Sequence, residues 1–341
     1  MNQSSRTIQL SVFLVIILLG MTLSSALNSG DSNELKKEET AQQTHANVST
    51  LFYPGSQGGS TYSYSTISAS EDSTCAVAED HSMRCWGRNN HLQLGTESTP
   101  TNTSLNEPKK VYLNSGGGSS SALEVSGYGE HTCALMSDGR MKCWGRDDRS
   151  QHGSNQTSLL PEATWFDSSG ALGSNSVVQV SSGRNHTCAI LTDQSLWCWG
   201  DNNWGQLGRG FISNTPFWYP AKVTSGNPSN AKWIAVSAGA EHTCGILLNG
   251  TAYCWGWDTY WKLGWGGLGT TLAVPSYVAV LPQNRTVAAI SAGSHNTCAI
   301  LDDYSLYCWG YSTNGVLGSG TSSTTSPRTG STTSARRRST E

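Results

Sequence analysis

Residues 177–208 read VVQVSSGRNHTCAILTDQSLWCWGDNNWGQLG and contain the pattern that decides the fold: two cysteines nine residues apart, the second followed by Trp-Gly. The pattern occurs five times, at intervals of 58, 55, 56 and 54 residues. A fixed period of this size is typical of solenoids and propellers, in which one small unit stacks on the next. The five pairs use all ten cysteines of the chain: Cys75 with Cys85, Cys133 with Cys143, Cys188 with Cys198, Cys244 with Cys254, and Cys298 with Cys308.

Each copy predicts a small antiparallel sheet. Val177–Val180, Thr187–Leu191 and Ser195–Trp199 are short segments rich in residues that favour strands. The intervening Thr192–Gln194 matches Asp-Gly and Asn-Gly in other copies, which indicates a tight hairpin turn. Pro220–Val223 predicts a fourth, outer strand, because an edge strand tolerates proline. Four strands in about 55 residues make a propeller blade. The sequence therefore predicts an all-β propeller with five recognisable blades of about four strands each.

The constant spacing sets the register of each hairpin. With a three-residue loop at 192–194, Cys188 lies opposite Cys198, and the same count applies to every copy. Opposed residues on antiparallel strands have Cβ atoms about 4.5–5.5 Å apart, slightly more than a disulfide needs. We therefore expect five disulfides within hairpins. The alternatives are zinc ligation, which prefers a shorter Cys-x2-4-Cys spacing, and buried free thiols.

These residues resemble the repeat of the regulator of chromosome condensation family. The matching pieces are Gly-x-x-His-Thr-Cys-Ala-Ile/Leu, the Asp-Gly turn, Cys-Trp-Gly and Gly-Gln-Leu-Gly, over about residues 67–320. The resemblance implies β-propeller blades and a scaffold for partners rather than a catalyst. The best-known members of the family have seven blades, so five copies fit either a five-bladed ring or an incomplete set. The fifth copy lacks a convincing outer strand after Leu317-Gly318, and Phe52-Tyr53-Pro54 is a candidate to supply it.

The ends of the chain differ in composition from the repeats. Residues 1–26 combine Arg6, a 14-residue apolar run at Leu10–Leu23 and small residues after it, as in a secretory signal. The alternative is an uncleaved membrane anchor. We expect 27–66 to be a polar linker, 67–318 the propeller and 319–341 a Ser/Thr-rich disordered tail. Because paired cysteines persist in oxidising compartments, a secreted or cell-surface protein is predicted.

The charge balance gives no case for nucleic-acid binding. The formal net charge is −3, and removal of 1–26 would leave 20 basic against 24 acidic residues. Proteins that bind nucleic acids usually present a basic face. We therefore expect no nucleic-acid partner, and contact with a membrane only through the N-terminal segment.

Charged and aromatic residues recur just after each Trp-Gly. Because blades superpose, these residues share one rim of the propeller, and aromatic and arginine side chains are enriched at binding hot spots. The alternative is that they pack between neighbouring blades. The candidate binding residues are Arg88, His91, Arg146, Arg149, Trp204, Trp257, Tyr260, Trp261 and Tyr311.

Four copies carry a histidine just before the first cysteine: His131, His186, His242 and, one place earlier, His295. A ring of histidines could bind a metal, but repetition in each blade favours a hydrogen bond that pins the histidine's own blade. No histidine-acid-serine constellation and no phosphate-binding glycine loop is visible in the sequence. We therefore predict no enzyme activity, no cofactor and no metal.

The expected function is protein binding through the rim, with a partner of unknown identity. One alternative is binding of a surface glycan, because exposed tryptophans stack on sugars, and another is a structural spacer. Within the family that the repeat resembles, one branch promotes nucleotide exchange on a GTPase and binds chromatin, a role disfavoured here by the signal and the paired cysteines. A secreted bacterial branch inhibits β-lactamases. The Gly-Trp-Arg-His-Thr motif of the plant ultraviolet receptor is absent.

Overall fold

The computed structural model describes residues 64–96, 103–113, 121–153, 164–165, 174–224, 226, 231–267 and 270–318. All of them belong to one compact unit, residues 47–341. The predicted signal segment 1–26, Phe52-Tyr53-Pro54 and the predicted tail 319–341 lie outside the described residues. In the described ranges, no helix is long and apolar enough to cross a membrane.

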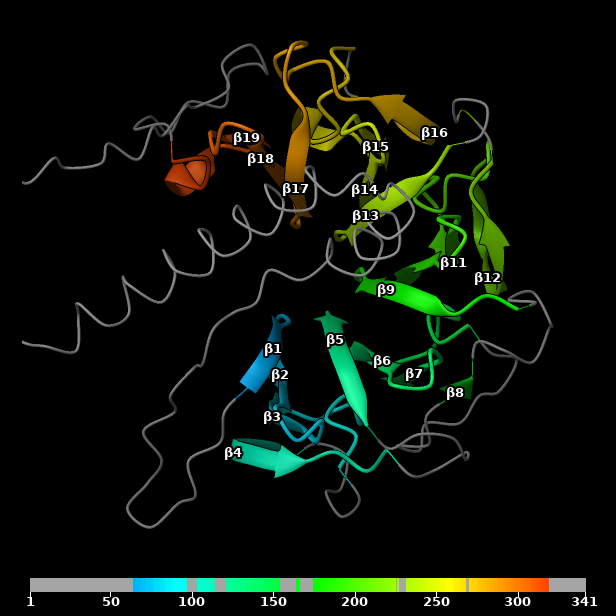
Figure 1. Ribbon diagram of the computed structural model, residues 1–341, viewed down its shortest axis with the longest axis vertical. Helices are drawn as coiled ribbons and strands as arrows, with labels where there is room; N and C mark the ends of the chain where they lie inside the picture. Colours follow the sequence, from blue (N-terminus) through cyan, green and yellow to red (C-terminus); the bar gives the residue numbers. More distant parts are fainter. Residues whose placement is uncertain are drawn as a thin grey trace, which may run out of the picture. The chain divides into compact units, whose positions relative to one another are not determined.

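Five antiparallel sheets follow one another along the chain, which confirms the predicted all-β propeller fold with five blades (Figure 1). Blades 1 and 2 consist of β1 (Tyr64–Ala69), β2 (Ser73–Ala78), β3 (Met83–Arg88) and β4 (Ser104–Lys110), then β5 (Ala122–Tyr128), β6 (His131–Met136), β7 (Met141–Gly145) and β8 (Thr164–Trp165). Blades 3 and 4 consist of β9 (Val177–Ser182), β10 (His186–Leu191), β11 (Leu196–Asn202) and β12 (Ser213–Lys222), then β13 (Trp233–Ala238), β14 (His242–Leu247), β15 (Ala252–Gly256) and β16 (Leu272–Tyr277). Blade 5 consists of β17 (Val287–Ala292), β18 (Asn296–Leu301) and β19 (Leu306–Gly310).

Three element bounds differ from the sequence prediction. β1 begins at Tyr64, so residues 64–66 belong to the first blade and not to the linker. β12 begins at Ser213, seven residues before the predicted outer strand, because two irregularities in its pairing with β11 let the longer segment follow the neighbouring strand. In the described part of blade 5 there are three strands, as the weak fifth copy led us to expect.

The central hairpin of each blade has the predicted register. Cys188 lies opposite Cys198, and the two sulfurs are bonded with a Cα–Cα distance of 4.2 Å. Gln194, the third residue of the turn, has a φ of +64°, and its N–H donates to the Leu191 carbonyl. This is the geometry of a type I turn followed by a bulge.

The remaining cysteines form the same bond at the same position in their own hairpins. In each pair the two residues face each other across the central strands, with a Cα–Cα distance of 4.1 Å. These disulfides join Cys75 to Cys85, Cys133 to Cys143, Cys244 to Cys254, and Cys298 to Cys308. No cysteine is free. The pairing expected from the spacing is therefore present in all five blades, in place of the alternatives of zinc ligation and free thiols.

The glycine of each Cys-Trp-Gly has a backbone that other residues rarely adopt. Gly200 has a φ of +102°, and a Cβ built there would lie 2.6 Å from the carbonyl oxygen of Asn185. A side chain at this position would therefore collide with the backbone of the neighbouring strand. The glycine lets β11 approach the start of β10 closely and turns the chain into the loop that follows.

The first strand of each blade packs against the first strand of the next. At one repeated position a serine hydroxyl accepts the backbone N–H of the following blade, as in Ser182 N to Ser126 Oγ and Ala238 N to Ser181 Oγ, both 2.9 Å. The same contact joins Gly127 to Ser68 and Ala292 to Ser237. Because the residues at these positions are small, the two neighbouring backbones come close enough for a single serine Oγ to link them.

We call the interface between two consecutive blades a seam, and the tryptophan of Cys-Trp-Gly forms its core. The Trp199 indole N–H donates to the Gln151 carbonyl of the preceding blade (3.0 Å), and Trp144, Trp255 and Trp309 make the equivalent bond. These four indoles are buried. The Thr187 hydroxyl donates to the same Gln151 carbonyl (2.8 Å). One carbonyl of each blade is thus held by two donors of the next.

The buried histidines complete the seams, which corrects the prediction that each pins its own blade. His186 Nε2 lies 2.9 Å from Thr243 Oγ1 in the next blade. The Thr243 hydroxyl donates its proton to the Gln206 carbonyl, so its oxygen accepts the hydrogen bond from His186. Nε2 of His186 therefore carries the proton. His131 bonds Thr187 and His242 bonds Thr297 in the same way. Spacing within one repeat does not say which blade supplies the partner, so the sequence argument chose the wrong one.

Each of the two end blades has a seam on one side only among the described residues. Ile300 of blade 5 is 41% exposed, whereas its counterpart Ile190 in blade 3 is 1% exposed. At the other end Trp86 is only half-buried, unlike the four seam tryptophans. Asn296 stands where three other blades have the seam histidine. Blades 1 and 5 therefore each present one face with the residue types of a seam and without a described partner.

Candidate functional site

The loops after Cys-Trp-Gly in blades 1 to 3 are held by hydrogen bonds from their own side chains to their backbone, and blade 4 keeps one of the two bonds, Leu263 N to Asp258 Oδ1. In blade 3, Asn202 Oδ1 accepts the Leu207 N–H (3.1 Å) and Gln206 Oε1 accepts the Trp204 N–H (2.9 Å). Blades 1 and 2 repeat both bonds. Such loops fix the positions of the side chains they carry. We call the surface formed by these five loops the rim face.

A second set of residues lies on the same face. The first residue after each Trp-Gly donates its backbone N–H to a carbonyl in the turn before the second strand of the same blade. Examples are Trp257 N to Glu241 O (2.8 Å) and Arg146 N to Glu130 O (2.9 Å), where each acceptor lies two residues before the seam threonine. This second set, which includes Glu130 and Glu241, therefore lies next to the predicted rim residues.

The structure places most of the predicted rim residues at seams. The fourth residue of one loop meets the first residue of the next: Arg149 lies 4.0 Å from Asp201, the rings of Trp204 and Trp257 stack with centroids 4.4 Å apart, and those of Tyr260 and Tyr311 lie 4.5 Å apart. At the first seam His91 and Arg146 both approach Glu130, at 3.3 and 2.8 Å. Arg88 instead pairs with Asp72 of its own blade, and Trp261 makes none of these seam contacts.

The aromatic pairs both pack and remain open to solvent. Trp204 and Trp257 are stacked at 16° and each keeps part of its surface exposed, while Tyr260 is 43% exposed. An aromatic pair of this kind stabilises by about 0.5–1.5 kcal/mol beyond its buried area. Packing between blades and availability for a partner therefore coexist in the same rings.

Lys262 was not among the predicted residues, although the signal was present in the sequence. It replaces the glutamine of Gln-Leu-Gly, so it cannot accept the backbone N–H that Gln206 accepts. Its side chain is fully buried, and Nζ donates to Glu241 Oε2 (3.2 Å) and to the Ser294 carbonyl (3.3 Å). Burial lowers the pKa of Lys262, and the Glu241 carboxylate opposes that shift. Nζ also lies 4.9 Å from the centre of the Trp257 ring.

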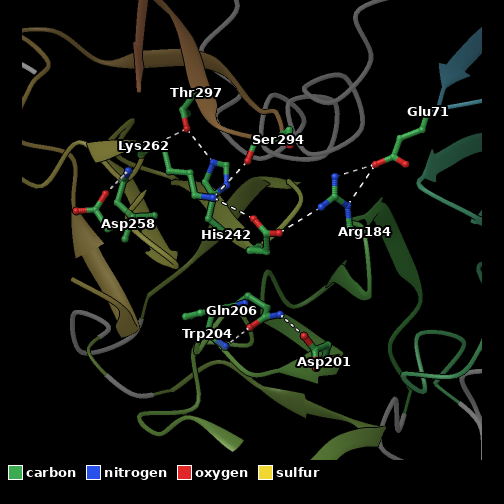
Figure 2. A network of polar contacts seen from close by, with 12 residues as sticks. Glu71, Arg184, Asp201, Trp204, Gln206, His242, Asp258, Lys262, Ser294 and Thr297 are labelled. Atoms are coloured by element: carbon green, nitrogen blue, oxygen red, sulfur yellow. Dashed lines mark hydrogen bonds and ion pairs between the residues drawn. The ribbon is translucent and has the colours of Figure 1, made fainter. Parts of the chain in front are cut away.

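An ion-pair network extends from Lys262 through Glu241 and Arg184 to Glu71 (Figure 2). Arg184 donates to Glu71 (2.9 Å) and lies 3.3 Å from Glu241, so it links blades 1, 3 and 4. Figure 2 shows Glu71 and Lys262 on opposite sides of Arg184. Sequence reasoning missed this network, because residues from three copies meet only once the blades curve around a centre.

A separate group of apolar residues lies at the outer edge of blade 3. Four of them are exposed and Phe217, against which Phe211 and Tyr219 pack, is half-buried; we call this group the outer patch: Phe211, Ile212, Phe217, Trp218 and Tyr219. Trp218 and Tyr219 are each 42% exposed. The Arg209 guanidinium lies 4.3 Å from the Phe217 ring centre and 4.9 Å from that of Tyr219. The prolines of β12 suit an edge strand, where they hinder pairing with another strand.

The described residues include no group of three or more His, Cys, Asp or Glu side chains that could hold a metal ion. Each of the three seam histidines is hydrogen-bonded to a threonine of the next blade. The rim face carries aromatic side chains and charged groups of both signs. The arrangement is suited to recognition of another molecule.

Two similar models of one repeat match the chain. Both describe the regulator of chromosome condensation (RCC1) repeat; the first matches residues 64–93, 124–151, 177–206, 233–260 and 287–316, and the second matches 193–246 and 249–300. Each of the five matches of the first model begins in or at the first strand of a blade. Sequence matches and blades therefore coincide.

Curated relatives have several roles. The ultraviolet-B receptor UVR8 of Arabidopsis thaliana is 31% identical over 74% of this chain and 54% of its own length. The regulator of chromosome condensation of Mus musculus is 26% identical over 74% of this chain and 61% of its own length. This chain thus spans little more than half the length of these relatives.

Solved structures show the same fold. Human WBSCR16 superposes with a TM-score of 0.65 and 19% identity, over 76% of this chain and 64% of the other. Prp20p of Saccharomyces cerevisiae, studied for its binding to Gsp1p and histones, superposes with a TM-score of 0.63 and 21% identity, over 76% of this chain and 61% of the other. With five matched repeats and five blades, the chain belongs to the regulator of chromosome condensation (RCC1) repeat family.

Proposed function

We propose that this protein is an exported or surface-displayed binding module that holds a protein partner on its rim face. The observation that carries the proposal is the partly exposed Trp204–Trp257 stack, because Lys262 lies next to the Trp257 ring and continues through Glu241 to Arg184 as a charged network. Aromatic anchors next to charged groups are typical of binding hot spots. Propellers with this repeat bind proteins elsewhere, as Prp20p does with Gsp1p.

Export is supported by two features. All ten cysteines are paired in hairpins, and the first 26 residues have the composition of a secretory signal. Sequencing the N-terminus of the protein from the culture medium tests this part of the proposal. We expect a mature chain that begins near Leu27. A protein that is extracted only by detergent with Met1 intact would contradict it.

Binding is tested by capture of partners with the full chain as bait. We expect Trp204→Ala and Tyr260→Ala to weaken binding by about 2 kcal/mol or more for each hot spot. Leu248→Ala is the matched control, because Leu248 is also exposed but lies in the hairpin turn at the opposite end of β14. Equal binding by the parent and both rim variants would overturn the proposal for the rim face.

The outer patch favours a second candidate function, binding of a surface glycan. Trp218 and Tyr219 present exposed rings on β12, the edge strand of blade 3, and do not belong to a rim loop. Aromatic faces stack on the apolar faces of sugars. A glycan array tests this candidate: a bound sugar whose signal is lost in Trp218→Ala but kept in Trp204→Ala would assign the outer patch. An array without any bound sugar would leave the rim as the single proposed site.

A role in nucleotide exchange or chromatin binding has less support. Prp20p is studied for such partners, but this chain shares 21% identity with it and spans 61% of its length. The acidic charge balance of this chain disfavours binding to nucleic acid, and its paired cysteines favour an oxidising compartment. We infer binding, and not catalysis, as the activity of this protein.

A further inference from the structure

Gln179 makes a two-point contact across the seam between blades 3 and 4. Its Oε1 accepts the Val236 N–H at 3.0 Å, and its Nε2 donates to the Val236 carbonyl at 3.4 Å. An amide side chain suits this role because it offers one acceptor and one donor side by side. The contact extends the first strand of one blade toward the first strand of the next.

Glu124 stands at the same position in blade 2. Both residues follow the irregularity in the first strand and face equivalent residues of the second strand, Leu135 and Ile190. The Val180 N–H donates to the Glu124 carboxylate, as Val236 does to Gln179. The second carboxylate oxygen, Oε2, is buried and has no hydrogen-bond partner in the described part of the chain. In Gln179 the second polar atom of the side chain is the donor nitrogen.

We propose that Glu124 is held as the neutral carboxylic acid and donates its Oε2 proton to the Val180 carbonyl, so that it joins blades 2 and 3 as Gln179 joins blades 3 and 4. An ionised carboxylate has acceptors only, and it would place a charged oxygen opposite a carbonyl oxygen. The neutral acid has one donor and one acceptor, like the amide. The O–H of the acid thus takes the donor role that the NH2 group has in glutamine.

The surroundings of Glu124 favour the neutral form. The strands packed against β5 are β1, β2, β6 and β9. In β2 and β9 there is no Asp, Glu, Lys, Arg, His or Tyr, and the titratable groups of the other two are Tyr64 in β1 and His131 in β6, whose ring bonds Thr187. Tyr128 lies at the far end of β5 itself. No cation is present on these strands to stabilise a carboxylate. Burial raises the pKa of Glu124 to about 8, and the Val180 N–H opposes part of that shift.

The Glu124–Val180 contact makes the seam between blades 2 and 3 sensitive to alkaline pH. The seam between blades 2 and 3 also contains the Trp199–Gln151 bond and, on the rim face, the Arg149–Asp201 pair. A carboxyl group with a raised pKa binds more protons in the folded state than in the unfolded state between about pH 4.5 and pH 8. Its contribution to stability is therefore complete below about pH 4.5 and lost as the pH rises through about 8.

The test is a reciprocal exchange of the two side chains in the full-length protein. Urea unfolding is measured from pH 5 to pH 9 for the parent, Glu124→Gln and Gln179→Glu. The ratio of the parent's unfolding constant to that of Glu124→Gln should rise by up to about tenfold for each pH unit as the pH approaches 8, and then level off. Gln179→Glu should acquire the same pH dependence in the neighbouring seam.

A second measurement needs no variant to fold. The infrared difference spectrum of the parent between pH 7 and pH 9 should contain the C=O band of a protonated carboxyl group that is lost on the alkaline side. Burial raises the pKa of Asp147 to about 6, so at pH 7 that carboxyl is mostly ionised and contributes little to the band. If Glu124→Gln folds, the band should be absent from its spectrum. A parent without this band at pH 7, or an unfolding ratio that does not change with pH, would overturn the proposal.

Discussion

Tryptophan has two distinct roles in this chain, and the difference lies in what surrounds each indole. Trp199 and Trp255 are fully buried and donate to a carbonyl of the preceding blade, whereas Trp204 and Trp257 stack on each other at the rim and stay partly exposed. We expect Trp199→Ala and Trp255→Ala to cost about 3–5 kcal/mol of stability, because each leaves a cavity and an unsatisfied carbonyl. We expect Trp204→Ala and Trp257→Ala to cost about 1 kcal/mol each.

Denaturant unfolding of the four variants separates these two roles. Trp86 is half-buried, so it does not serve as a reference for a buried seam tryptophan, and Trp309 does. If the rim variants lose as much stability as Trp199→Ala, the rim rings are structural and the partner must be sought on another surface.

The seam histidines make stability sensitive to acid. Burial lowers the pKa of His186 to about 3, and burial shifts His131 and His242 in the same direction. The folded state then binds fewer protons than the unfolded state between about pH 3 and the ordinary histidine value of about 6.5, so this contribution is complete above about 6.5 and lost as the pH falls. Unfolding at pH 7 and pH 4.5 should differ by a few kcal/mol (~1–5). His186→Asn, which copies Asn296 of blade 5, should reduce the difference; an unchanged slope would argue against a buried neutral imidazole.

At the scale of the elements, the hairpin is the unit that the sequence specifies best. A constant spacing of nine residues and a three-residue turn determine which residues face one another, so the register of Cys188 and Cys198 could be predicted. The outer strand was predicted at Pro220–Val223, but its length and register could not be, because its pairing is irregular and depends on the loop that brings Phe217 back to Gly200. Non-local pairing of this kind leaves little trace in local pattern.

Each hairpin disulfide should be visible by peptide mapping without reduction. Five links within the repeats are expected, and any link between repeats would contradict the hairpin arrangement. Because the closed loops are short, replacement of both Cys188 and Cys198 by alanine should cost near the low end of about 2–4 kcal/mol. Thermal unfolding of this double variant against the parent measures the cost, and a larger loss would mean that the bond also supports the seam beside it.

For the whole molecule, the seams determine which blade faces are covered. Ile190 lies in the core between blades 3 and 4, whereas Ile300 on blade 5 is largely open. We expect Ile190→Asp to cost about 3–5 kcal/mol or to prevent folding, since it buries an unpaired charge, and Ile300→Asp to cost less than about 1 kcal/mol. Denaturant midpoints of the two variants provide the comparison. A comparable loss at Ile300 would show that the open face of blade 5 is covered in solution.

The candidate site could be predicted only in part, because it is formed by contacts between blades. Superposition of the repeats predicts one shared face for Trp204, Trp257 and Tyr260, but it does not show that Trp204 meets Trp257, and Tyr260 meets Tyr311, across seams. The Glu71–Arg184–Glu241–Lys262 network was invisible, because its members lie up to 191 positions apart and meet only through the curvature of the blades. Repeat patterns describe one blade well and say little about contacts between blades.

The location of the disulfides has a mechanical consequence. Every one of the five bonds closes a hairpin, so no covalent cross-link joins one blade to another. The seams depend on hydrogen bonds, ion pairs and packed side chains alone. Under tension applied to its two ends, such a chain would yield at the seams and release its blades one after another. Each released blade would still keep about eleven residues tied in a closed loop, which shortens the extension gained at every step.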